Sequence, residues 1–326
     1  MRLWQRIRRR IERFSASYGA YRFLVGRWDH LTDLDVIARA MDTEFFRREI
    51  KPVELPVLRK RSYLLIAPHQ DDESIGAAGT LSLAADAGCQ VNVLFATDGV
   101  QLNTPESPAE IAAIREEEAQ RACRTIGAQV HHLGLWNPRP EPTLQHLDSL
   151  AALIERLAPD VLMVPWLFDS PPKHRLMNHL LWLTNLRRPL PACEVWGYQV
   201  HNTVYPNGYV DITDVIGRKR DALRCYESQN RQFRPYDHVS VGLSAWNARY
   251  LPVFDHEETH RYAELFFSVP LQEHLELVEK FYFRDIPATY QGDSDVYEPL
   301  QALHHQVEQE SQASRSSRQA RKSAAA

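Results

Sequence analysis

The amino-acid sequence predicts an α/β protein with a single domain, in which helices cover both faces of a mainly parallel sheet. From Tyr63 onward, short apolar segments of strand length alternate with longer segments of helical character. Several strand–helix units in a row are typical of a parallel sheet. The composition, with 44% hydrophobic and 25% charged residues, is that of an ordinary globular chain, which excludes collagen-like, low-complexity and disulfide-scaffold classes.

The alternating segments define the elements of this sheet in chain order. The predicted strands are 63–68, 91–97, 131–135, 161–166 and 194–200. The predicted helices are 74–87, 108–126, 143–157 and 174–185, and a further helix covers 271–281. Because ligands of such sheets bind beyond the carboxyl ends of the strands, we expect a site in the loops after Pro68, Thr97, Leu135 and Trp166.

The pattern predicts one domain with two extensions, although a length of 326 residues alone suggests two domains. Residues 1–60 read as a helical extension, and residues 61–285 form the predicted main domain. Residues 286–326 are polar, and their last part is rich in Ser, Ala, Gln and Arg, so we expect a largely disordered tail.

The first fourteen residues have the pattern of a basic amphipathic helix. Leu3, Ile7, Ile11 and Phe14 follow helical spacing, and arginines fill most other positions. This pattern is typical of a helix that lies in a membrane interface. A helix docked on the body of the protein through the same apolar stripe explains the pattern equally well, and both interpretations stay open.

Charge and cysteine usage limit the partners and the compartment. The net charge is −4, yet both ends of the chain are basic, so the body between them is clearly acidic. An acidic body argues against a nucleic-acid-binding surface. The four cysteines form no Cys-x-x-Cys pair, and no apolar run is long enough to span a bilayer. We therefore expect a cytoplasmic protein, peripheral at the inner membrane face if residues 1–14 bind lipid.

The most informative segment follows the first predicted strand and reads Pro68-His69-Gln70-Asp71-Asp72-Glu73. Three carboxylates and an imidazole in such a short segment repel or crowd one another unless a cation binds them. His with Asp suits Zn²⁺ or Fe²⁺ better than Ca²⁺. In a turn, His69 and Asp72 can reach one metal ion, which leaves Asp71 to accept a proton from metal-bound water. The alternative interpretation is a helix N-cap with surplus acids.

This segment closely resembles the Pro-His-Pro-Asp-Asp-Glu signature of the PIG-L/LmbE-like deacetylases. Further pieces of the family pattern follow in order: Thr97-Asp98-Gly99, Arg115-Glu116-Glu117, Asp211-Ile212-Thr213, Lys219, Tyr226-Glu227-Ser228-Gln229 and Tyr262-Ala263-Glu264. The resemblance implies a Rossmann-like fold and a Zn²⁺ ion held by two His and one Asp. It also implies a zinc-dependent hydrolase that removes the N-acetyl group from an amino sugar or sugar conjugate through zinc-bound water.

The resemblance also assigns roles to individual residues. It implies that His69 and Asp72 are metal ligands and that Asp71 is the general base. The third ligand of the family is the last His of a His-Pro-Asp-His-like motif, and His174 occupies that place. The first His of the motif falls on Pro171 and its Asp on Lys173. The acid that protonates the leaving amine is therefore missing from its usual place, and we expect His201 or Lys173 to supply it.

Three polar residues near the predicted site are candidates for substrate contact: Asp98, Arg115 and Asn137. For Asp98 and Arg115 the alternative is a salt bridge on a helix surface. The expected partner is a small N-acetylated amino sugar or glycoconjugate. Two other functions stay open, namely hydrolysis of a non-sugar acyl conjugate and a catalytically weak scaffold subunit in glycan assembly.

Overall fold

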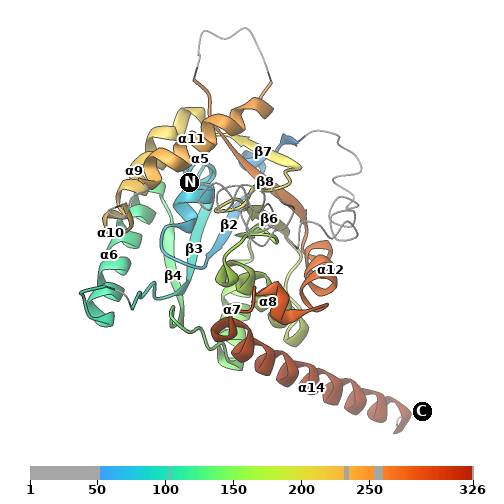
Figure 1. Cartoon of the computed structure of the whole chain (residues 1–326). Coiled ribbons are helices and arrows are strands. Elements are labelled where there is room, and N and C mark those ends of the chain that lie inside the picture. The colour runs from blue at the N-terminus through green and yellow to red at the C-terminus, as the bar shows by residue number, and fades with distance from the viewer. Residues whose placement is uncertain (1–51, 103, 231–234, 253–259, 325–326) are drawn as a thin grey trace, which may run out of the picture.

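The structure, a computed structural model, describes residues 52–102, 104–230, 235–252 and 260–324. These residues form one α/β domain around a single sheet (Figure 1). Its strands are β1 Val53–Glu54, β2 Ser62–Ala67, β3 Gln90–Thr97, β4 Gln129–Leu135, β5 Val161–Pro165, β6 Glu194–Tyr198, β7 Gly208–Asp211 and β8 Ala263–Pro270. Their order across the sheet is β1-β7-β8-β6-β5-β2-β3-β4.

The sheet is mainly parallel, as the sequence predicts. Strand β8 alone pairs antiparallel, and it does so with both of its neighbours, β6 and β7. The five predicted strands correspond to β2 through β6. Strands β1, β7 and β8 were not predicted: β1 and β7 are short, with two and four residues, and β8 follows a long region without strand–helix alternation.

Helices cover both faces of the sheet. On one face lie α5 Asp72–Asp86, α6 Pro108–Ile126, α9 Ile216–Arg224 and α11 Tyr236–Asn247; on the other lie α7 Leu144–Leu157, α8 Pro172–Arg187, α12 Leu271–Tyr282 and α14 Ser294–Ala324. Short helices α10 Glu227–Asn230 and α13 Ile286–Thr289 join them. In β2, Tyr63 and Leu65 face the first layer and Leu64 and Ile66 the second, all fully or almost fully buried. A strand buried on both faces is apolar throughout, which is why β2 reads as a continuous apolar run.

Helix α5 packs close to the sheet because its residues are small. A Cβ atom on Gly76 would lie 2.3 Å from Cδ2 of Tyr198, so no larger residue fits there without a shift. Helix α6 has clear boundaries: Ser107 and Glu110 form a capping box, and Gly127 ends the helix in the left-handed conformation at φ 80°.

The chain reverses its direction of travel across the sheet between β2 and β5. From β2 the chain moves outward through β3 to β4, then returns through α7 to β5 on the other side of β2. Ligands of open α/β sheets bind beyond the carboxyl ends of the strands at such a switch point. The fold therefore points to the loops after β2 and β5.

The C-terminal segment differs from the expected disordered tail. Helices α13 and α14 begin at Ile286 and Ser294, and Val296, Leu300 and Leu303 of α14 are buried in the core cluster that also contains α7 and α8. The polar composition concealed this packing because the apolar residues of α14 are few and lie on one side of a long helix.

The end of the expected N-terminal extension belongs to the sheet. Strand β1 lies within the expected extension, 1–60, and pairs with β7, so this part of it belongs to the sheet. The predicted amphipathic helix, residues 1–14, lies outside the described residues, and its membrane contact remains a prediction, as does a cytoplasmic location. Among the described helices, none combines the length and the apolar character that crossing a bilayer requires.

A buried ion pair joins three elements on the α5 face. Lys219 of α9 donates to Glu264 of β8 at 2.7 Å, and both side chains are almost fully buried. Lys219 also donates to the carbonyl of Ile75, while Glu264 accepts from the backbone N–H groups of Gly79 and Thr80 in α5. Two motif positions far apart in the sequence thus form one network.

We predict that Lys219→Met destabilises the protein by about 3–5 kcal/mol, because it leaves the Glu264 carboxylate buried without its counter-charge. Urea unfolding at pH 7, followed by circular dichroism, measures the change. The matched control is Arg218→Gln, which removes the neighbouring, partly exposed pair with Asp86. An equal loss in both variants would contradict a special role of the buried pair.

Candidate metal site

Three residues from two strand ends converge at the switch point. His69 follows β2, Asp72 is the first residue of α5, and His174 lies in the first turn of α8 after β5. The distance from Asp72 Oδ2 to His69 Nδ1 is 3.2 Å, and to His174 Nε2 it is 3.5 Å. One potential ligand atom of each residue lies within 4.8 Å of the other two. Neighbouring parallel strands β2 and β5 bring together residues that are 105 positions apart in the sequence.

The cluster fits a metal ion by its chemistry. His174 Nδ1 lies 2.8 Å from Asp169 Oδ2, and in the neutral tautomer that donates its proton to Asp169, Nε2 carries the lone pair. Nε2 is buried and has no hydrogen-bond partner among the described residues, although it faces Asp72. A buried polar atom without a hydrogen-bond partner is costly, and a metal ion on the shared side of the cluster would satisfy it.

Asp169 is the residue of this site that the sequence analysis did not assign a role. Its buried carboxylate accepts hydrogen bonds from His174 and from the backbone N–H groups of Ser170, His201 and Asn202. Metal-bound histidines usually donate their other ring N–H to such a carboxylate. The available signal was its position, since Asp169 begins the polar segment that follows β5 and lies five residues before His174.

Asp71 and Glu73 have separate surroundings. Asp71 has an unusual backbone conformation at φ 152°, and such conformations cluster at functional sites. Burial raises the pKa of Asp71 to about 8, which the nearby Arg115 guanidinium opposes. Glu73 accepts hydrogen bonds from the hydroxyl of Tyr226 and the backbone N–H of Asp71. The Asp71 side chain makes no N-cap hydrogen bond to α5, so the alternative of a plain N-cap does not describe it.

The three residues expected to contact substrate are largely engaged within the protein. Asp98 Oδ1 accepts from the backbone N–H groups of Val100 and Asn137. The Asn137 amide donates to the Val100 carbonyl and accepts from Lys173 Nζ at 3.1 Å. These bonds join the loops after β3 and β4 to α8.

Arg115 of α6 lies against the Gln70–Asp71 loop and is only 2% exposed. It donates to the carbonyl of Gln70, and its Nη2 atom lies 3.5 Å from Asp71 Oδ2. Arg115 also pairs with Glu118 of the same helix at 3.8 Å, but both side chains are buried, so the alternative of a helix-surface salt bridge does not describe Arg115.

His201 lies beside the cluster on the loop after β6. Its ring centroid is 5.1 Å from that of His174, and its backbone N–H binds Asp169. Pro171, in the place of the family's first motif His, is the N-cap residue of α8. Lys173, the other expected substitute, points its ammonium group at Asn137. Of the two expected proton donors, His201 is therefore the better placed, because its ring packs against His174 of the cluster.

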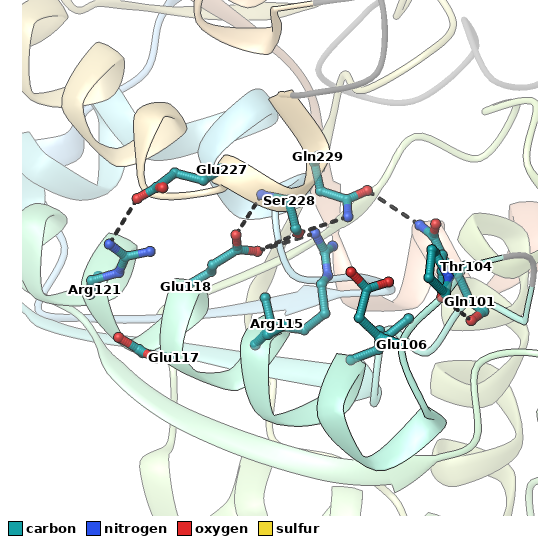
Figure 2. Close-up of a pocket in the computed structure, with 13 residues that line it drawn as sticks. Gln101, Thr104, Glu106, Arg115, Glu117, Glu118, Arg121, Glu227, Ser228 and Gln229 are labelled. Atoms are coloured by element: carbon teal, nitrogen blue, oxygen red, sulfur yellow. Dashed lines mark hydrogen bonds and ion pairs between the residues drawn. The ribbon is translucent and has the colours of Figure 1, made fainter.

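Arg115 also lines a cavity of about 430 Å³ (Figure 2). It is lined by α6, by the loop before α6 and by α10. Glu118 closes one wall by accepting from the backbone N–H and the hydroxyl of Ser228, each at 2.7 Å. The lining includes none of the three cluster residues, so Arg115 is the link between the cavity and the site.

Comparisons with known proteins agree with these observations. Residues 64–184 match the family model PIG-L, described as GlcNAc-PI de-N-acetylase. The diacetylchitobiose deacetylase of Thermococcus kodakarensis is 30% identical over 187 residues, which are 52% of this chain and 70% of that protein. The 4-oxalmesaconate hydratase of Pseudomonas putida is 22% identical over 204 residues, 56% of this chain and 79% of that protein.

A solved structure shares the fold. The N,N'-diacetylchitobiose deacetylase from Pyrococcus horikoshii superposes with a TM-score of 0.56 over 66% of this chain and 85% of that chain, at 24% identity. The described sheet, the signature after β2 and these matches lead to one conclusion: this chain belongs to the PIG-L family of de-N-acetylases.

Proposed function

We propose that this protein is a metal-dependent hydrolase that removes the N-acetyl group from an amino sugar or a sugar conjugate, with Zn²⁺ as the metal. The observation that carries the proposal is the convergence of His69, Asp72 and His174, with His174 Nε2 buried and directed at Asp72. Two His and one carboxylate are a typical ligand set of catalytic zinc sites, which keep one position open for water or substrate.

The three cluster residues would hold the metal. When bound, a dication polarises the carbonyl of the acetyl group and lowers the pKa of water. The protein then contributes the proton transfers and the orientation of the reacting groups.

Asp71 is the general base in this proposal. It lies next to the cluster but takes no part in it, so its carboxylate accepts a proton from the water that attacks the carbonyl carbon. Arg115 holds this carboxylate and the preceding Gln70 carbonyl in place. When the C–N bond breaks, acetate leaves and the sugar amine needs a proton.

His201 supplies that proton in our proposal. Its ring packs near that of His174, and the neighbouring Asp169 carboxylate fixes the backbone of its loop. A protonated His at this point also stabilises the negative charge on the carbonyl oxygen as it develops. For Asp98 and Asn137 we propose a positioning role, since their bonds fix the loops around the substrate.

An acetate-release assay tests the function directly. We expect release from N-acetylglucosamine, diacetylchitobiose or a glycoconjugate of N-acetylglucosamine, loss of release with a chelator, and recovery when Zn²⁺ is restored. His69→Ala should lose both metal and activity, whereas Asp71→Asn should keep the metal and lose about 10²–10⁴-fold in kcat.

The controls separate the alternatives. Acyl amino acids and acylated thiol conjugates test the non-sugar hydrolase, and 4-oxalmesaconate tests hydration, the reaction named for the Pseudomonas putida relative. Full activity of the metal-free protein would refute the metal mechanism. Stoichiometric metal without acetate release from any acetylated sugar would favour the scaffold alternative.

The role of His201 can be tested with Pro171, which stands where the family motif has its first His. We expect His201→Ala to lower kcat with little change in KM, because the proton donor acts in the transition state. Installing the family residue by Pro171→His in the same variant should restore part of the rate. A His201→Ala variant with unchanged kcat would exclude this role.

We also predict that Asp169→Asn weakens metal binding by about 10–100-fold, because an amide cannot hold the His174 ring as a carboxylate does. Competition with a chromophoric chelator measures the affinity. Asp160→Asn is the matched control, since Asp160 also accepts backbone N–H groups but lies at the opposite end of β5. Equal affinities in the two variants would contradict the orienting role of Asp169.

A further inference from the structure

The loop between β5 and α8 carries Asp169, and side chains from the C-terminal segment hold its backbone. The hydroxyl of Tyr282 donates to the carbonyl of Leu167 at 2.7 Å. The amide of Gln291 donates to the carbonyl of Ser170. Backbone groups that are shielded from water are normally hydrogen-bonded within the protein. Here the donors come from residues more than 110 positions later in the chain.

Arg175 completes this arrangement from the side of α8. Its Nε atom donates to the Asp169 carbonyl at 2.7 Å, and its Nη1 atom donates to the Thr289 carbonyl. The side chain is only 2% exposed. The guanidinium therefore bridges the loop and the C-terminal segment in a place where water cannot replace either bond. The backbone carbonyls of Leu167, Asp169 and Ser170 thus accept hydrogen bonds from the side chains of Tyr282, Arg175 and Gln291, respectively.

The C-terminal segment is itself anchored. The Tyr290 hydroxyl lies 2.9 Å from His179 Nδ1, and His179 Nε2 lies 2.9 Å from His304 Nδ1 in α14. All three side chains are buried. Since His179 belongs to α8, the helix that begins beside the site, the contact fixes the segment to the same helix that carries His174.

We propose that Tyr282, Arg175 and Gln291 are positioning residues of the metal site, and that the segment 282–291 acts as a clamp on the loop that carries Asp169. The proposal rests on the proposed metal site. By fixing the carbonyls on either side of Asp169, the clamp fixes the carboxylate that holds the His174 ring. The clamp segment lies outside residues 64–184, which the family model matches.

The distinguishing measurement is metal affinity, because a purely structural role would change stability alone. Gln291→Glu keeps the shape of the side chain but removes the N–H donor to Ser170. We expect a Zn²⁺ affinity about tenfold lower, in the range found for outer-shell changes. The ligand-field absorption of bound Co²⁺ should also shift, with only a small change in unfolding temperature.

The matched control is Arg187→Gln. Arg187 of α8 binds Asp148 of α7 and Glu310 of α14 on the surface, and these bonds include no residue of the loop. We expect it to leave the Zn²⁺ affinity and the Co²⁺ spectrum unchanged. The double variant Asp169→Asn/Gln291→Glu should bind Zn²⁺ no more weakly than Asp169→Asn alone, because both changes act on the same carboxylate.

Several outcomes would overturn the clamp. These are an unchanged Zn²⁺ affinity in Gln291→Glu, an equal loss in Arg187→Gln, and additive losses in the double variant. All readouts use the full chain and need no substrate. A protein that binds Zn²⁺ but releases no acetate would thus refute the proposed reaction and leave the clamp supported, whereas a protein that binds no metal would refute both.

Discussion

The site depends on the parallel pairing of β2 with β5. This pairing places the carboxyl ends of two strands side by side at the switch point, and both strand ends contribute residues to the cluster. His69 and Asp72 come from one loop and helix start, and His174 comes from the other. A change of register between the two strands would move these half-sites apart along the sheet, since one residue of a strand spans about 3.3 Å.

Electrostatics assigns different tasks to three adjacent carboxylates. Asp72 faces the two histidines, Asp71 lies against Arg115, and Glu73 turns to the Tyr226 hydroxyl. The separation is possible because Asp71 adopts a backbone conformation that residues other than glycine rarely adopt. Three adjacent acidic residues thus become one member of the cluster, one candidate base and one structural acceptor.

The sequence could predict what depends on local pattern. Strands β2 through β6, the helices between them and the approach of His69 to Asp72 follow from apolar runs and from spacing. Asp169 could not be recognised in the same way, because its role depends on three-dimensional contacts with His174 and Asn202. The packing of α14 was missed for a similar reason, since a few apolar residues on a polar helix become meaningful only when α8 lies beside them.

The position of β8 has a consequence for how the chain is assembled during synthesis. This strand lies between β6 and β7, although it follows β7 by more than fifty residues. Strands β1 and β7 can pair with each other early, but they join the main sheet only after residue 270 has left the ribosome. Until then β6 has an open edge that is prone to incorrect pairing, and a nascent chain that pauses before β8 exposes that edge for longer.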